Sequence, residues 1–154
     1  MKLEYQVCSL ELAKKLKELG VPQESNLIWV ESAPFFDGNF SERDVLLNPD
    51  QWLDLIDNTG EDYETYAAFS VADLGALLPY KITFTDQKFE IFDIPIKSAY
   101  LQLWVTEEPG DYYSVKRIYT VKYGAIFRES YSEAEARASM LIYLLENNLV
   151  SFPS

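Results

Sequence analysis

The stretch that decides the fold is SEAEARASMLIYLLENNL, residues 132–149 of a chain of 154 residues. Ser132 and Glu135 have the spacing of a capping box, in which two side chains satisfy backbone N–H groups at the start of a helix. The apolar residues recur at helical spacing and form one continuous stripe, made of Ala134, Ala138, Leu141, Ile142, Leu145 and Leu149. Because residues 140–145 are apolar on nearly every side, this helix is predicted to lie at the centre of the core.

Three further helices are predicted from the residues that begin them. Ser9 is placed to cap a first helix, which ends at Gly20. Asn48, followed by Pro and then by Gln three residues after the cap, predicts a short helix that ends near residue 57. Ser70 begins a third capping box. Gly75 inside that helix costs about 1 kcal/mol relative to Ala, which predicts close packing at this point.

Between these helices the sequence alternates polar and apolar residues, which is typical of strands. Strands are predicted over residues 26–31, 80–85, 88–94, 100–106, 112–123 and 125–129. The second and third of them are expected to pair as a hairpin, with Ile82 and Phe84 facing Phe89 and Ile91. Residues 107–111 are predicted to form a turn. Residues 32–48 are predicted to form a loop, in which 43–47 could make a short edge strand.

These elements predict one α+β domain over residues 1–154. A chain of 17.8 kDa is long enough to bury a sizeable core without disulfides or metals. The aromatic share of 15% favours sheet structure, because aromatic side chains suit half-buried pleated surfaces. We expect a mainly antiparallel sheet of about five strands, packed by the N-terminal and C-terminal helices.

The composition disfavours several kinds of chemistry. The chain contains no His and one Cys, so it lacks an imidazole base, an intrachain disulfide and a thiolate zinc cage. Cys8 has no basic neighbour in sequence and is interpreted as a structural thiol. No glycine-rich phosphate loop, nucleophile elbow or dinucleotide motif is present. We therefore predict no catalytic residue, no metal ligand and no cofactor.

Charge and hydropathy also predict the cellular location of the protein and the kinds of partner it does not bind. The net charge of −12 repels phosphate backbones, so direct binding to nucleic acid is not expected. No apolar run approaches the 18 residues of a membrane span, and the first residues do not read as a signal peptide. A single unpaired cysteine fits a reducing compartment. We predict a cytoplasmic protein that does not bind membranes.

The most unusual local feature is an acidic tract between residues 44 and 80 that contains no basic residue. The residues predicted to bind a partner are Asp50, Asp54, Asp57, Glu61, Asp62 and Glu64. Three interpretations remain open: a solvated helix face, a site for a hard cation such as Mg²⁺, and a surface that imitates nucleic-acid phosphates. The spacing does not match a calcium loop, because Leu55 stands where the loop needs an acid.

Three segments resemble a family of small uncharacterised proteins encoded in phage and prophage regions of bacteria. They are residues 8–25 running on to Trp29 and Val30, residues 66–79 with the ending VADLGALLP, and residues 133–150. The resemblance implies a phage-type accessory protein and no particular activity. The strands between residues 80 and 130 carry no motif of this family.

Two functions of different classes follow from the sequence. The first is a non-enzymatic phage-type protein that binds another protein through acidic and aromatic surface, one form of which is a decoy for a basic nucleic-acid-binding protein. The alternative is a small carboxylate-dependent or metal-assisted hydrolase that uses acids such as Asp54, Asp57 and Glu61. An enzyme predicts a deep pocket with converging acids, whereas a binding module predicts a flat or grooved surface with exposed aromatic side chains.

Overall fold

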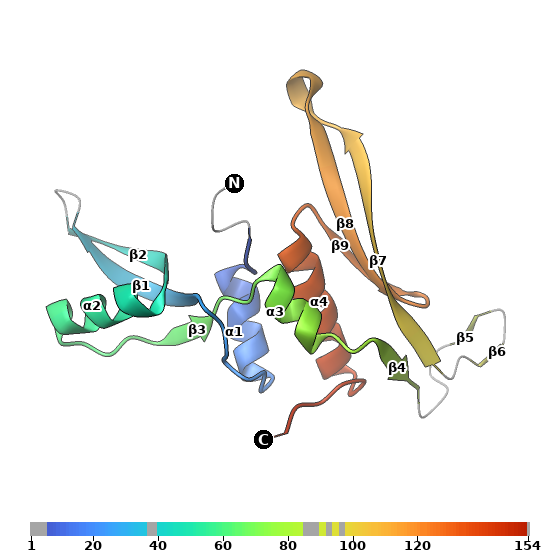
Figure 1. The fold of residues 1–154 in the computed structure, drawn as a ribbon, viewed down its shortest axis with the longest axis horizontal. Coiled ribbons are helices and arrows are strands. Elements are labelled where there is room, and N and C mark those ends of the chain that lie inside the picture. Colours follow the sequence, from blue (N-terminus) through green and yellow to red (C-terminus); the bar gives the residue numbers. More distant parts are fainter. Residues whose placement is uncertain (1–5, 37–39, 85–89, 92–93, 96–97, 154) are drawn as a thin grey trace.

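The structure is a computed structural model that describes residues 6–36, 40–84, 90–91, 94–95 and 98–153. Helix α4 (Glu133–Glu146) lies at its centre (Figure 1). Helices α1 (Leu10–Glu18) and α3 (Val71–Leu77) pack against α4, and one antiparallel sheet extends from either side of this helical centre. The α+β class and the central position of the last helix are therefore confirmed.

The N-terminal ends of α1 and α4 are joined by one side chain. Ser132 caps α4, since its hydroxyl accepts a hydrogen bond from the backbone N–H of Glu135. The predicted capping box is nevertheless wrong in its second half. The carboxylate of Glu135 accepts from the backbone N–H of Ser9 instead, and the N–H of Ser132 donates to the hydroxyl of Ser130 at 3.2 Å. Glu135 thus connects two helices that are distant in sequence.

The capping predictions for the other helices are confirmed. Ser9 caps α1, and complete capping boxes begin α2 (Pro49–Thr59) and α3. Gly75 lies where a Cβ atom would approach the guanidinium of Arg137 to 2.9 Å. This contact confirms the predicted close packing, with the end of the flexible Arg137 side chain as the neighbour.

A three-stranded sheet in the order β2-β1-β3 forms one side of the molecule, from strands Phe40–Leu47, Ile28–Phe36 and Thr65–Ala67. The prediction of a loop over residues 32–48 is therefore wrong for most of the described residues, whereas the short edge strand predicted over residues 43–47 is confirmed as part of β2. A bulge near Ser32, whose φ is 55°, shifts the register and interrupts the alternation of apolar residues. Pro34 is tolerated in β1 because β3 pairs only with residues 28–30, which leaves that edge open at Pro34.

The second sheet has the order β4-β7-β8-β9, from strands Lys81–Thr83, Ser98–Pro109, Val115–Tyr123 and Ile126–Ser130. The predicted hairpin of residues 80–85 with 88–94 is wrong, because β4 pairs with β7 and places Ile82 opposite Ala99, where both are buried. Strands β5 (Glu90–Ile91) and β6 (Ile94–Pro95) pair with each other. The predicted partner Phe89 lies outside the described residues. The expected single sheet of about five strands is thus divided.

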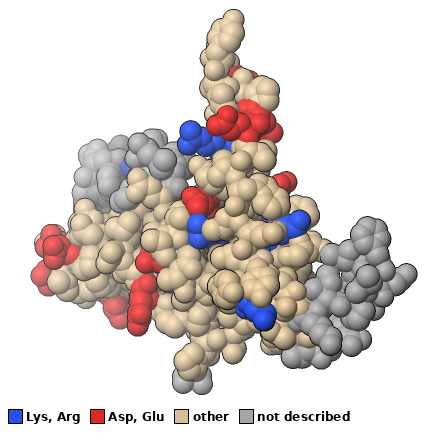
Figure 2. All heavy atoms as spheres, turned by 45° about the vertical axis from the view of Figure 1, so that its right-hand side comes forward, with Lys and Arg blue, Asp and Glu red and all other residues tan. Residues whose placement is uncertain are grey.

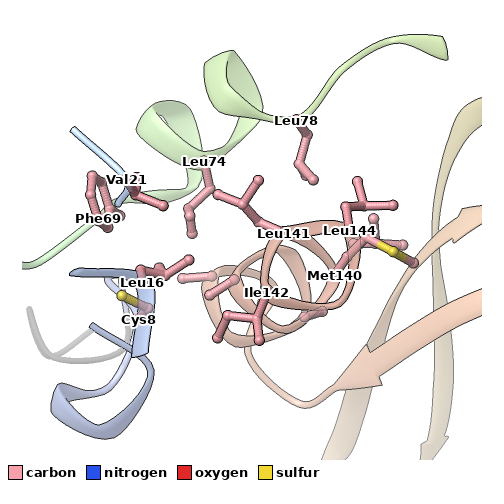
Figure 3. Packing of buried hydrophobic residues seen from close by; sticks show 14 of the residues in the cluster. Cys8, Leu16, Val21, Phe69, Leu74, Leu78, Met140, Leu141, Ile142 and Leu144 are labelled. Carbon is pink, nitrogen blue, oxygen red and sulfur yellow. The ribbon is translucent and has the colours of Figure 1, made fainter. Parts of the chain in front are cut away.

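The core surrounds α4 (Figure 3). Leu141 points toward Leu74 of α3, and Leu16 of α1 approaches from another side; all three side chains have no exposed surface. On the sheet side, Val121 and Tyr123 of β8 are fully buried. The hydroxyl of Tyr123 donates a hydrogen bond to the carbonyl of Pro79, which ties the sheet to the end of α3. None of the helices in the described part of the chain has the length and apolar character needed to cross a bilayer.

Candidate functional site

The three aspartates of α2 lie on its solvent side. Asp50, Asp54 and Asp57 are all exposed, and within the described residues no Lys or Arg pairs with them. The other side of α2 rests on the protein through Trp52, whose ring centroid lies 6.4 Å from that of Tyr63. The helix contains no fully buried residue. The acidic face is therefore open to solvent.

The other predicted acids do not join this face as one site. Glu61 accepts a hydrogen bond from the hydroxyl of Tyr63 at 3.1 Å, and Asp62 is exposed. Glu64 pairs with Lys17 of α1, with 2.7 Å between Oε1 and Nζ. Across the described ranges, no three His, Cys, Asp or Glu side chains lie close enough together to hold a metal ion. The metal-assisted alternative therefore gains no support from their placement.

Cys8 lies in the core and has no exposed surface. Its backbone N–H donates to the carbonyl of Phe69 at 2.9 Å, and its own carbonyl accepts from the indole N–H of Trp29 at 2.9 Å. Burial raises the pKa of the thiol from 9.0 to about 12, and the negative charges of Glu135 and Asp73 act in the same direction. A buried thiol that keeps its proton is a poor nucleophile, so the geometry agrees with a structural role.

A hollow of about 270 Å³ lies between α1, β9 and α4. Its charged side chains are Arg128 and Glu146, and the guanidinium of Arg128 stacks over Tyr143 at 4.6 Å from the ring centroid. One acid beside one base differs from the pair of converging carboxylates that a hydrolase of the predicted type needs. This hollow therefore does not serve the enzymatic alternative.

A long hairpin made by β7 and β8 projects from the body of the protein (Figure 1). Strand β9 pairs only with residues 119–123 of β8, so the hairpin continues as two strands beyond it. We call residues 103–118 the arm; its first three residues lie opposite residues 119–121, which β9 still pairs with, and the two-stranded part begins at Thr106 and Ile118. On the side of the sheet that faces α4, the arm carries three partly exposed apolar side chains: Leu103, Val105 and Val115, which are 44%, 52% and 59% exposed. Leu103 and Val105 line a hollow of about 90 Å³ with Glu133 at the start of α4, and Val115 lies further along the arm.

The tip of the arm holds two fully exposed tyrosines in an unfavourable backbone conformation. Tyr112 and Tyr113 have φ angles of 54° and 63°, in the left-handed region that only Gly, Asn and Asp enter readily. Each such residue costs on the order of 1 kcal/mol. The predicted turn at 107–111 is therefore displaced, since β7 continues to Pro109 and the chain reverses over residues 110–114. Burial of the two rings does not offset this strain, because both are fully exposed. The conformation therefore indicates that the rings contact something outside this chain.

The sequence does not reveal the arm. Residues 112–123 continue the alternating pattern of β8, and tyrosine favours strands, so a left-handed turn at Tyr112 leaves no local signal. The apolar stripe of Leu103, Val105 and Val115 is visible as a pattern. Whether a helix covers such a stripe depends on how far α4 reaches along the sheet, which only the structure shows.

Comparisons with known proteins identify no relative. No protein-family model, curated protein or solved structure matches the chain. The resemblance to phage-encoded proteins, which rests on residues 8–30, 66–79 and 133–150, therefore stays a prediction.

Proposed function

We propose that this chain is a phage-type accessory protein of the cytoplasm that binds another protein and catalyses no reaction. The observation that carries the proposal is the arm. Its apolar stripe starts beside the first residue of α4 and continues along the core-facing side of the sheet to Val115, and the arm ends in Tyr112 and Tyr113, which are fully exposed. Exposed aromatic residues next to apolar side chains are typical of the centre of protein interfaces.

The partner that fits this arm has an apolar cleft that is wide enough for a two-stranded ribbon. Arg117 and Glu107 lie opposite each other on the same face as the stripe, with 3.8 Å between Nε and Oε1. A pair of opposite charges between apolar residues favours a cleft with a polar rim, since interfaces combine an apolar centre with a solvated edge. The tyrosines enter the cleft first because they form the end of the arm.

Replacing both tip tyrosines with Asn is expected to remove partner binding while leaving the fold intact. Asn tolerates the left-handed region, so the turn keeps its shape and loses only the rings. Losing an interface hot spot of about 2 kcal/mol weakens binding about 30-fold. We would measure this by affinity capture from bacterial lysate with quantitative mass spectrometry, comparing wild type with the Tyr112→Asn, Tyr113→Asn double variant. A protein that both bait forms retain equally contradicts binding through the tip.

The acidic face of α2 supports a second form of the same function, a decoy for a basic partner. Its support is the exposure of Asp50, Asp54 and Asp57 without a cation partner in the described part of the chain. The matched variant changes all three to Asn and leaves the arm untouched. A partner of this face is expected to be lost with that variant and to dissociate as salt rises. Capture that depends on neither the variant nor salt contradicts the decoy.

A further inference from the structure

The side of the four-stranded sheet that faces away from α4 carries a row of exposed aromatic side chains. Strand register places Tyr100 and Trp104 of β7 on this side, and Phe127 of β9 lies opposite Lys122 on it. These three rings are 51%, 43% and 52% exposed, and Tyr131, which follows β9, is 63% exposed. We call this surface the outer sheet face, defined by Tyr100, Trp104, Phe127, Tyr131, Lys81, Lys116 and Lys122.

Each lysine of the outer sheet face lies over an aromatic ring. The Nζ atom of Lys81 lies 5.6 Å from the ring centroid of Tyr100, that of Lys122 lies 5.4 Å from Trp104, and that of Lys116 lies 5.6 Å from Tyr131. Within the described ranges, none of these three ammonium groups pairs with a carboxylate. In a chain with 25 acidic residues, three unpaired lysines on one face are a local departure from the overall charge.

Two acids also belong to this side of the sheet. Glu108 accepts a hydrogen bond from the hydroxyl of Tyr131 at 2.6 Å, and Glu129 lies opposite Thr120. Counted over the described residues, the face carries three lysines and two acids and is slightly positive, whereas the whole chain carries −12. In Figure 2 the basic side chains are spread over the body below the arm, and many of the visible acids lie at the left edge of the view and on the arm.

We propose that the outer sheet face binds single-stranded nucleic acid. The face offers flat rings, three of them each next to an ammonium group that pairs with no carboxylate of the described residues. A single strand supplies a complement to both, namely base faces that can stack and phosphates. An acidic protein segment supplies only the charge, and a duplex keeps its bases stacked inside. Tyr100 and Trp104 lie four residues apart on one strand, or about 13 Å, so bases on the two rings do not overlap once Lys81 and Lys122 turn from the rings toward the phosphates.

The net charge of the chain does not prevent this contact. Charges farther away than about 8 Å are largely screened at physiological ionic strength, so the side chains within the face determine the short-range attraction. The expectation from the sequence that no nucleic acid is bound rests on the whole-chain charge, and this proposal departs from it because the charge of the outer sheet face differs from that of the chain. Because only three lysines would contact phosphates, binding is expected to depend modestly on salt concentration.

The test titrates the full-length protein into a labelled oligothymidylate of about 20 nucleotides and follows fluorescence anisotropy. With three phosphate contacts, the slope of log K against log salt concentration is expected to be about −2 for a single strand. Trp104→Ala is expected to weaken binding at least about fivefold. Lys122→Gln is expected to make the slope shallower by about 0.7. Lys15→Gln removes an exposed lysine of α1 and is expected to change neither quantity.

Three results would overturn the proposal. One is the absence of binding at low salt. Another is a duplex of equal length that binds as tightly as the single strand, which would mean contact with the backbone alone. The third is binding of polyglutamate that depends on Lys122 while oligothymidylate does not bind, which would assign the face to an acidic protein segment. Lys122→Gln keeps the test decisive if Trp104→Ala does not fold, which thermal unfolding checks.

Discussion

Leu141→Ala is expected to lower the free energy of unfolding by about 2–5 kcal/mol. The side chain has no exposed surface and lies between α4, α3 and α1, where it points toward Leu74 (Figure 3). Removing it leaves a cavity that the surrounding helices cannot fill, because each is held by a cap and by its own core contacts. The total free energy of unfolding of a native protein is about 5–15 kcal/mol, so this loss is a large part of its stability.

Urea unfolding followed by circular dichroism measures this change. Leu53→Ala is the matched control, since Leu53 lies on α2 and is 57% exposed. We expect that variant to change stability by less than about 0.5 kcal/mol. If Leu141→Ala does not fold, Ile142→Val removes one methylene from the same helix and is expected to cost about 0.5–1.5 kcal/mol. A loss below about 1 kcal/mol for Leu141→Ala would contradict the central position of α4 in the core.

The success of the helix predictions has a local cause. A cap requires only a few neighbouring residues, such as Ser70 and Asp73 or Asn48 and Gln51, and all of them are visible in the sequence. The exception has an equally specific reason. Glu135 has the right spacing for a capping box, but folding brings the N–H of Ser9 within its reach.

Strand pairing could not be predicted in the same way, because it depends on contacts far apart in sequence. The sequence predicts that residues 80–85 pair with the next strand-like segment, as neighbours often do. Pairing of β4 with β7 instead buries Ile82 and Ala99 together on the side of the sheet that faces the core. Register also decides which side chains share a surface, so the pairing of Lys122 with Trp104 has no counterpart in the sequence pattern.

The candidate site shows the same difference between features that are local in sequence and features that depend on the fold. The acidic tract is a property of composition, and its exposure on Asp50, Asp54 and Asp57 agrees with the expected solvated face. The arm and its tip depend on where β9 and α4 end relative to β7 and β8. Sequence therefore indicates which residues carry charge, and the topology determines which apolar residues remain uncovered.

The protein is expected to lose stability steeply above pH 9. The thiol of Cys8 loses its proton near pH 9 in the unfolded chain, whereas burial keeps it protonated in the native state up to about pH 12. Between these values the native state binds more protons than the unfolded state, so its stability falls as pH rises. Above pH 9 the equilibrium constant for folding falls about tenfold with each pH unit. By pH 11 the free energy of unfolding is therefore lower by about 3 kcal/mol.

Tyr123 acts in the same direction at slightly higher pH. Burial raises the pKa of its phenol above the ordinary range, so above about pH 10 the unfolded state again loses a proton that the native state keeps. Urea unfolding of wild type, Cys8→Ala and Tyr123→Phe between pH 8 and pH 11 separates the two groups. Cys8→Ala is expected to flatten the decline that begins at pH 9, and Tyr123→Phe only the part above about pH 10. A decline that is identical in all three proteins would show that neither buried group causes it, because both variants keep every other titrating side chain.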